Sequence, residues 1–257
     1  FRHGRVLLGS RLIALFRIDR AWTERHLLPL LSWECPVEAK AVWEGFLWSP
    51  RIYPPLLTAF KADFLECANY YAELGEHRQQ FAAFLTYTAL FSIDNYSTDD
   101  FRAAIGTLPQ DGLEECAQAL SQALQGTAED QRADYWKNRV FPLWQEAWPK
   151  ERDRATPRMA ASLARLAIAA QDEFPSACTA IRDWLRPIEH PDFIAHLLKE
   201  SDLCSHFPVE ALTLLAAIVV DPPWVPRELG ECLNQISSAD ASLMQDVEYR
   251  RLRGYVR

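Results

Sequence analysis

Five regularly spaced prolines in the second half of the chain constrain its fold more than any other feature. They are Pro157, Pro175, Pro191, Pro208 and Pro226, and they recur about every 17 residues. Proline is favoured in the first turn of a helix, because its ring fixes a helical φ and its missing N–H would have no partner there. One helix start per ~17 residues predicts a helical hairpin per ~34, within the range of stacked helix-pair repeats.

Apolar stripes with helical spacing follow these prolines. The stripe behind the first proline is formed by Met159, Leu163, Leu166 and Ala170. Such a stripe needs a neighbouring helix to cover it, and residues 211–220, apolar nearly all round, need cover on several sides. Only 9 of 257 residues are glycine, fewer than a turn-rich β fold requires. We therefore expect an all-α fold of stacked helical hairpins, an α-solenoid or HEAT-like array with right-angle or superhelical stacking.

Prolines, capping residues and apolar periodicity together predict the helix boundaries. Ser97, Thr127 and Thr156 are expected N-caps, since a hydroxyl oxygen can accept from the free N–H groups of a first turn. Pro29 falls inside an apolar run and predicts a kink or an early helix end. The expected helices cover 4–17, 20–32, 36–47, 54–73, 77–93, 98–106, 110–125, 129–147, 157–171, 175–186, 191–202, 207–220, 226–237 and 240–252.

The stretch from Trp148 to Thr156 marks the best boundary along the chain, because it combines a proline with five charged side chains. We expect a single helical-repeat domain over 1–257, with two lobes at 1–148 and 157–257. The chain has no initiator methionine and opens in helix-compatible sequence. It is therefore expected to be a fragment of a longer polypeptide.

Charge is distributed unevenly along the chain. The net charge is −8, yet residues 1–25 carry six arginines against Asp19 and Glu24, a net of +4, and residues 247–257 carry +3. The body is thus acidic, which argues against a sequence-independent nucleic-acid binder. The basic ends either contact acidic neighbours or are solvated arginines on terminal helices.

The six cysteines are spread widely along the chain, mostly among apolar helix positions. This spacing predicts reduced, buried thiols in a cytoplasmic protein rather than the disulfide framework of a secreted one. The longest apolar run lies within residues 211–220, well short of the ~20 residues that a bilayer span needs. No membrane contact is expected.

The common motifs of catalysis and cofactor binding are missing from the sequence, which contains no HExxH, CxxC, GxGxxG or GxxxxGK[ST]. We therefore expect no catalytic residue, cofactor or metal in this chain. Four side chains of types that zinc accepts do occur in one short stretch, but no pair has the i, i+4 spacing of ligands on one helix face. The four residues are His190, His196, Cys204 and His206.

Nine tryptophans are an excess for this length, and three of them gather near one proline. Aromatic and arginine side chains dominate the energetics of protein interfaces. We therefore expect a partner-binding patch in this region; the alternative is that the tryptophans fill gaps between helix layers. The residues of the expected patch are Trp33, Trp43, Trp48, Arg51 and Tyr53.

Three runs of the sequence carry a resemblance to a known family: residues 43–53 (WEGFLWSPRIY), 148–154 (WPKERDR) and 184–191 (WLRPIEHP). They resemble an uncharacterised helical domain found at the C-terminal end of large bacterial proteins whose N-terminal part is sirtuin-like. The resemblance implies a parent protein that depletes NAD in defence against phage. The nucleotide-binding glycines and catalytic histidine of a sirtuin have no counterpart in this chain, so no catalytic residue carries over.

Architecture and resemblance together predict a non-catalytic recognition or regulatory domain, whose partner is a phage component or another domain of the parent chain. Two alternatives stay open. One is a homo-oligomerisation scaffold. The other is a hydrolase or transferase with a polar pocket between helices, formed by Arg186, Glu189 and His190.

Overall fold

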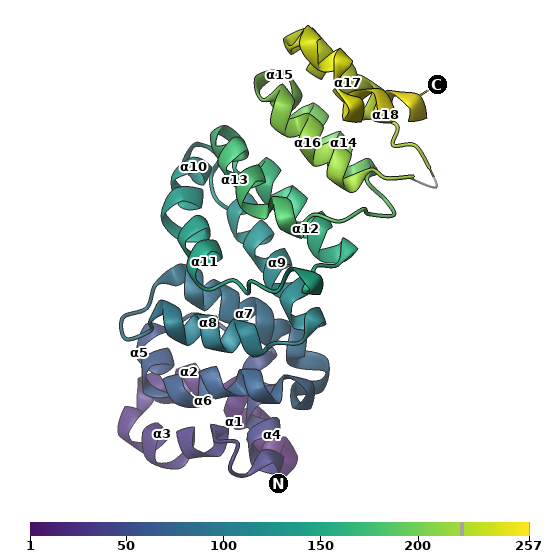
Figure 1. Ribbon diagram of the computed structural model, residues 1–257. Helices are drawn as coiled ribbons and strands as arrows, with labels where there is room; N and C mark the ends of the chain where they lie inside the picture. Colours follow the sequence, from purple (N-terminus) through teal and green to yellow (C-terminus); the bar gives the residue numbers. More distant parts are fainter. Residues whose placement is uncertain (222–223, 257) are drawn as a thin grey trace. The chain divides into compact units, whose positions relative to one another are not determined.

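The computed structural model describes residues 1–221 and 224–256, and every regular element in these ranges is helical (Figure 1). The expected all-α class is confirmed. Packing divides the chain into two compact units, Phe1–Cys116 with Glu146–Pro149, and Ala117–Gln145 with Lys150–Arg257. The helix α9 (Gln110–Gln125) contributes to both units, and of the three places where the chain passes from one unit to the other, only the one after Pro149 lies within the boundary expected at 148–156. That the chain forms one domain stays a prediction.

The first unit begins with short helices where the sequence predicted longer ones. The range 4–17 is broken at Arg11, and the range 54–73 is broken at Phe60, because both residues leave the helical φ/ψ region. Pro29 lies in a short 3-10 helix, which confirms the early end predicted there. The elements are α1 (Arg2–Ser10), α2 (Leu12–Ile18), α3 (Arg20–His26), a 3-10 helix (Leu28–Leu31), α4 (Pro36–Leu47), α5 (Pro54–Ala59), α6 (Lys61–Glu66), a 3-10 helix (Cys67–His77), α7 (Arg78–Phe91) and α8 (Thr98–Thr107).

Helices α1 and α4 cross with their backbones in direct contact. Gly9 of α1 and Gly45 of α4 are both buried at the crossing. A Cβ atom on Gly45 would overlap the carbonyl oxygen of Val6, and one on Gly9 would overlap that of Val42, each far inside the 3.0 Å limit of real Cβ contacts. Only glycine therefore permits this approach.

An aromatic cluster fills the core beneath this crossing. Trp43 is fully buried, its indole N–H donates to the carbonyl oxygen of Leu31 at 3.0 Å, and its ring lies 5.8 Å from the rings of Phe46 and Phe60. Edge-to-face pairs of this kind add about 0.5–1.5 kcal/mol beyond the burial of their area. The cluster continues to Phe64, whose ring contacts the rings of Phe81 and Phe84 in α7.

The second unit contains the proline-led helices. Pro157 and Pro208 occupy the first turns of their helices and Pro175 the first turn of a third, as predicted. Pro191 is the N-cap residue of its helix, and Pro226 lies in a turn before the next. The elements are a 3-10 helix (Glu129–Gln131), α10 (Arg132–Tyr135), a π-helical turn (Trp136–Val140), α11 (Phe141–Glu146), 3-10 helices (Arg152–Arg154, Gln171–Glu173, Arg182–Trp184, Ala241–Gln245), α12 (Pro157–Ala169), α13 (Phe174–Ile181), α14 (Asp192–Glu200), α15 (Leu203–His206), α16 (Pro208–Ile218), α17 (Leu229–Ala239) and α18 (Val247–Tyr255).

Two of the three expected N-caps are confirmed. Ser97 forms a reciprocal capping box with Asp100 at the start of α8, and Thr156 accepts from the backbone N–H of Met159 at 3.1 Å. The cap expected at Thr127 is wrong. Its hydroxyl instead donates to the carbonyl oxygen of Ala123 in the last turn of α9, and the next helical element begins only at Glu129, with Ala128 as its N-cap residue.

Neighbouring helices of the second unit cover one another's apolar stripes. Helix α12 packs against α13 and α14, and α16 packs against α13, α17 and α18. Five side chains of α16 are buried, as the apolar run in the sequence predicted, and Leu215 has no exposed surface.

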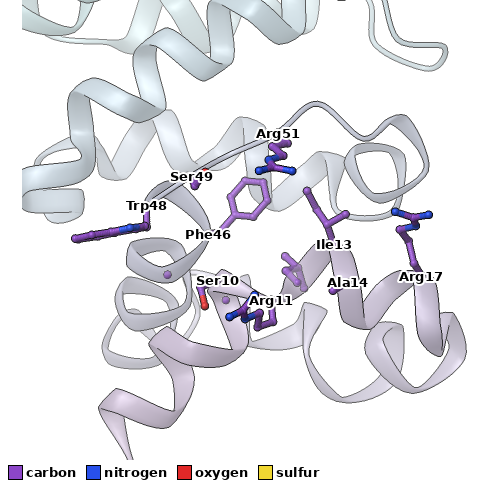
Figure 2. Close-up of a pocket in the computed structure, with 12 residues that line it drawn as sticks. Ser10, Arg11, Ile13, Ala14, Arg17, Phe46, Trp48, Ser49 and Arg51 are labelled. Atoms are coloured by element: carbon purple, nitrogen blue, oxygen red, sulfur yellow. The ribbon is translucent and has the colours of Figure 1, made fainter.

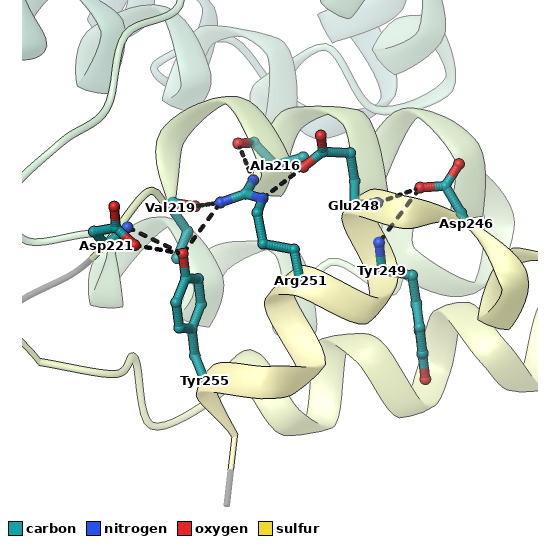
Figure 3. A network of polar contacts seen from close by, with 8 residues as sticks. All are labelled: Ala216, Val219, Asp221, Asp246, Glu248, Tyr249, Arg251 and Tyr255. Atoms are coloured by element: carbon teal, nitrogen blue, oxygen red, sulfur yellow. Dashed lines mark hydrogen bonds and ion pairs between the residues drawn. The ribbon is translucent and has the colours of Figure 1, made fainter.

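Arg251 of α18 closes the C-terminal end of α16 (Figure 3). Its guanidinium donates to the carbonyl oxygens of Ala216 at 2.7 Å and Val219 at 2.8 Å, and pairs with Glu248 at 2.7 Å. The last carbonyl groups of a helix lack intrahelical partners, and a cation is favoured at this negative end. The contact ties two helices of the second unit together.

We expect the substitution Arg251→Met to lower the free energy of unfolding by about 1–2 kcal/mol, because it keeps the apolar stem and removes the donors to two helix-terminal carbonyls. Urea denaturation followed by circular dichroism measures this loss. Arg253→Met, on an exposed side chain of the same helix, is the matched control and should change the free energy by less than about 0.5 kcal/mol. Equal losses in the two variants would contradict the role given to Arg251.

Five cysteines are buried and free, as predicted, whereas Cys35 is exposed. Burial raises the pKa of the Cys116 thiol to about 12. No helix within residues 1–221 or 224–256 combines the length and apolar character that a membrane span requires.

Candidate ligand-binding groove

The first unit carries a groove of about 550 Å³ at the place where α1, α2 and the end of α4 meet (Figure 2). The floor is apolar, and Phe46 and Ile13 lie between Arg51 on one side and Arg11 on the other. Its lining residues are Gly9, Ser10, Arg11, Leu12, Ile13, Ala14, Arg17, Gly45, Phe46, Trp48, Ser49 and Arg51.

The helix crossing builds this groove. Because Gly9 and Gly45 bring the backbones together, the C-terminal ends of α1 and α4 lie next to each other. Arg11 is the C-cap residue of α1, Arg17 lies in the last turn of α2, and Arg51 follows shortly after the end of α4. A helix C-terminus favours cations, which explains locally why arginine stands at such positions.

The three guanidinium groups are not neutralised. Within the described residues, Arg11, Arg17 and Arg51 have exposed side chains that make no ion pair or side-chain hydrogen bond, and the groove is lined by no carboxylate. Other arginines of α1 are paired: Arg2 with Glu44 and Arg5 with Glu38. The groove is therefore a local site of positive charge on a chain of net charge −8.

Trp48 stands at the rim of the groove. Its side chain is 77% exposed, its ring points away from the groove centre, and it touches the edge of His77 at a centroid distance of 5.8 Å. A large amphipathic ring held on a short, ordered segment is the kind of side chain that anchors interfaces. Trp48 and Arg51 are thus the two residues of the expected patch that the structure brings together.

Two other members of the expected patch, Trp33 and Trp43, lie in the core, and their assignment to a contact surface is corrected. The assignment of Tyr53 stays a prediction. Trp33 and Trp43 are 3% and 0% exposed, because they pack into the core; Trp33 stacks on Tyr70 at 4.5 Å. Tyr53 is half-buried and places its ring edge-on to Phe16. For these tryptophans the alternative of filling gaps between helices is the correct one.

The structure does not place Arg186, Glu189 and His190 in one groove, as the expected pocket requires. Arg186 lines a groove of the second unit, but its guanidinium already donates to three backbone carbonyls, those of Asp183, Leu185 and Arg152. Glu189 and His190 are exposed and do not line that groove, since the non-helical segment before α14 turns them to solvent. The three side chains therefore do not line that groove together.

The four potential zinc ligands do not form a metal site, and three of them have other surroundings. His206 lies 3.0 Å from the carbonyl oxygen of Asp202, His196 lies 3.9 Å from Glu228, and Cys204 is buried. No group of three or more potential ligands in the described part of the chain is placed to hold a metal ion.

Sequence reasoning missed Arg11, Arg17 and the apolar floor of the groove. The available signal was the excess of arginine in residues 1–25, which left open whether these side chains are solvated or contact acidic neighbours. Nothing in the spacing related them to Trp48 and Arg51, which lie much further along the chain. The crossing of α1 and α4 supplies that relation.

Comparison with known proteins gives little beyond this geometry. No protein-family model matches the chain. A stretch of 134 residues is 28% identical to part of the "Uncharacterized protein y4cA" of Sinorhizobium fredii (strain NBRC 101917 / NGR234), covering 51% of this chain and 11% of that protein. No solved structure matches. The chain thus spans about a tenth of the length of this relative.

Proposed function

We propose that this chain is a recognition domain without chemistry of its own, which binds a protein partner through the groove beside Trp48. The observation that carries the proposal is the groove itself, which combines an apolar floor, an exposed tryptophan and three guanidiniums that have no counter-charge among the described residues. Interfaces are rich in tryptophan and arginine at their energetic centres. A surface of this composition is suited to contact rather than to catalysis, since no general base lines it.

The proposal extends to the protein in which such a domain works. By its resemblance to the helical domain of sirtuin-like proteins, we propose that it serves a larger bacterial defence protein, and that its partner is a phage component or another part of that protein. The match to y4cA supports a modular role, because it covers only 11% of that protein. Cytoplasmic location belongs to the same proposal.

A displayed library of random peptides tests the recognition function without assuming the partner's chemistry. Peptides that bind the chain should lose at least about tenfold in affinity when Trp48→Ala and Arg51→Ala are combined, since both side chains are exposed and form the rim of the groove. Isothermal titration with the enriched peptides gives the affinities.

The matched control combines Trp224→Ala with Arg227→Ala, an exposed tryptophan and an exposed arginine of the second unit. It should leave the affinities within about twofold of the unchanged chain. If the library yields no peptide whose binding depends on Trp48 and Arg51, the recognition function fails.

A further inference from the structure

We propose that the occupant of the groove is an acidic linear segment of the partner protein, in which carboxylates flank an apolar side chain. This inference rests on the recognition function above and adds the chemistry of the ligand. It follows from the arrangement of the lining residues: cations on the rim and apolar groups on the floor.

The rim selects negative charge. Arg11, Arg17 and Arg51 present planar forks of N–H donors, which match the two oxygens of a carboxylate and form bidentate pairs with it. Because these guanidiniums have no partner among the described residues, a ligand carboxylate does not have to displace an internal one.

The floor selects an apolar side chain. Ile13 is half-buried and Ala14 is exposed, so both offer carbon surface to the groove, and Phe46, only 4% exposed, closes its bottom. A volume of about 550 Å³ is within the size range of small-ligand sites, and is enough for a few side chains. A purely anionic ligand would leave this floor uncovered.

The charge of the whole chain favours a peptide over a nucleic acid. A sequence-independent nucleic-acid binder neutralises many successive phosphates with an extended basic surface. Here the groove presents only three guanidiniums rather than an extended basic surface, and the net charge of −8 repels a long polyanion. A short acidic segment can bind in the groove while the rest of the partner protein makes no contact with the acidic surface of this chain.

Three labelled probes test this inference: a peptide of alternating glutamate pairs and leucines, the same peptide with glutamine for glutamate, and an oligothymidylate of similar length. Fluorescence anisotropy gives their affinities at low and physiological salt. The glutamate peptide should bind at least about tenfold more tightly than the glutamine peptide, and its affinity should fall as salt rises. It should also bind more tightly than the oligothymidylate.

Two triple variants locate the effect in the groove. Arg11→Ala, Arg17→Ala and Arg51→Ala together should weaken binding of the glutamate peptide at least about thirtyfold. Replacement of Arg25, Arg227 and Arg253 by alanine removes the same charge from exposed positions outside the groove, and should cost less than about threefold. Thermal unfolding of both variants checks that they remain folded.

Equal binding of the two peptides, equal losses in the two triple variants, or no binding of the glutamate peptide would overturn the inference. Tighter binding of the oligothymidylate would assign the groove to single-stranded nucleic acid instead. These results are distinct from failure of the recognition function. If the random library yields neutral peptides that depend on Trp48 and Arg51, the groove recognises a protein, but by other chemistry.

Discussion

The substitution Leu215→Asp is expected to unfold the second unit. Leu215 lies in α16 with no exposed surface, among four other buried side chains of the same helix. The change removes an apolar contact, worth about 2–5 kcal/mol for truncation to alanine, and buries a carboxylate that has no partner. The sum approaches or exceeds the ~5–15 kcal/mol that stabilises a typical domain. Far-UV circular dichroism should show a large loss of helix at room temperature.

Two companion variants separate the contributions. Leu215→Ala creates the cavity without the charge, and should leave a folded chain with a lowered urea midpoint. Thr213→Asp places the same carboxylate two positions away on an exposed site of α16, where about 0.5 kcal/mol or less is expected. A folded Leu215→Asp variant with a midpoint near that of Thr213→Asp would mean that α16 is not the buried helix described here.

The substitution Gly45→Ala is expected to destabilise the first unit by about 3 kcal/mol or more, because backbone atoms rather than flexible side chains would have to move. The added methyl group would overlap the carbonyl group of Val6 and press on the backbone nitrogen of Ser10, at 2.9 Å. Helices α1 and α4 must then separate, which exposes the core beneath them and widens the groove. Urea denaturation measures the loss.

The substitution Gly4→Ala should raise the free energy of unfolding, whereas Gly45→Ala should lower it. Gly4 is an exposed residue of α1, and an added Cβ would meet nothing within 4 Å. Replacing glycine by alanine inside a helix stabilises it by up to about 1 kcal/mol when the space is open. If Gly4→Ala and Gly45→Ala shift stability equally, the close crossing of α1 and α4 is absent.

The sequence predicts where helices begin when residues within one turn determine the start. Pro157 and Pro208 start helices because ring geometry acts within one turn, and the capping box at Ser97 involves only neighbouring residues. Pro226 was placed in the first turn of a helix but lies in the turn before α17. A proline φ suits both positions, so the pattern alone does not separate them.

The groove was only half predictable, for a different physical reason. Trp48 and Arg51 were found because their side chains are unusual in themselves, whereas Trp33 and Trp43 carry the same chemistry and differ only in burial. Nothing in the sequence marks Gly45 as a contact residue. A glycine inside a helix lowers the stability of that helix, and its role in close packing becomes visible only when the neighbouring helix is known. Tertiary contact between distant segments decides which tryptophan is exposed and which arginines line the same groove.

The distribution of the thiols gives the native chain a single reactive handle for chemical labelling. Cys35, which precedes α4, is exposed, whereas Cys67 and Cys116 lie inside the first unit and three more lie inside the second. Thiolate, the reactive form, is suppressed where burial raises the pKa. A fluorophore or spin label can therefore be attached at one known place without replacing any residue. Slower modification of Cys67 or Cys116 would report opening of the first unit, and slower modification of Cys178, Cys204 or Cys232 would report opening of the second.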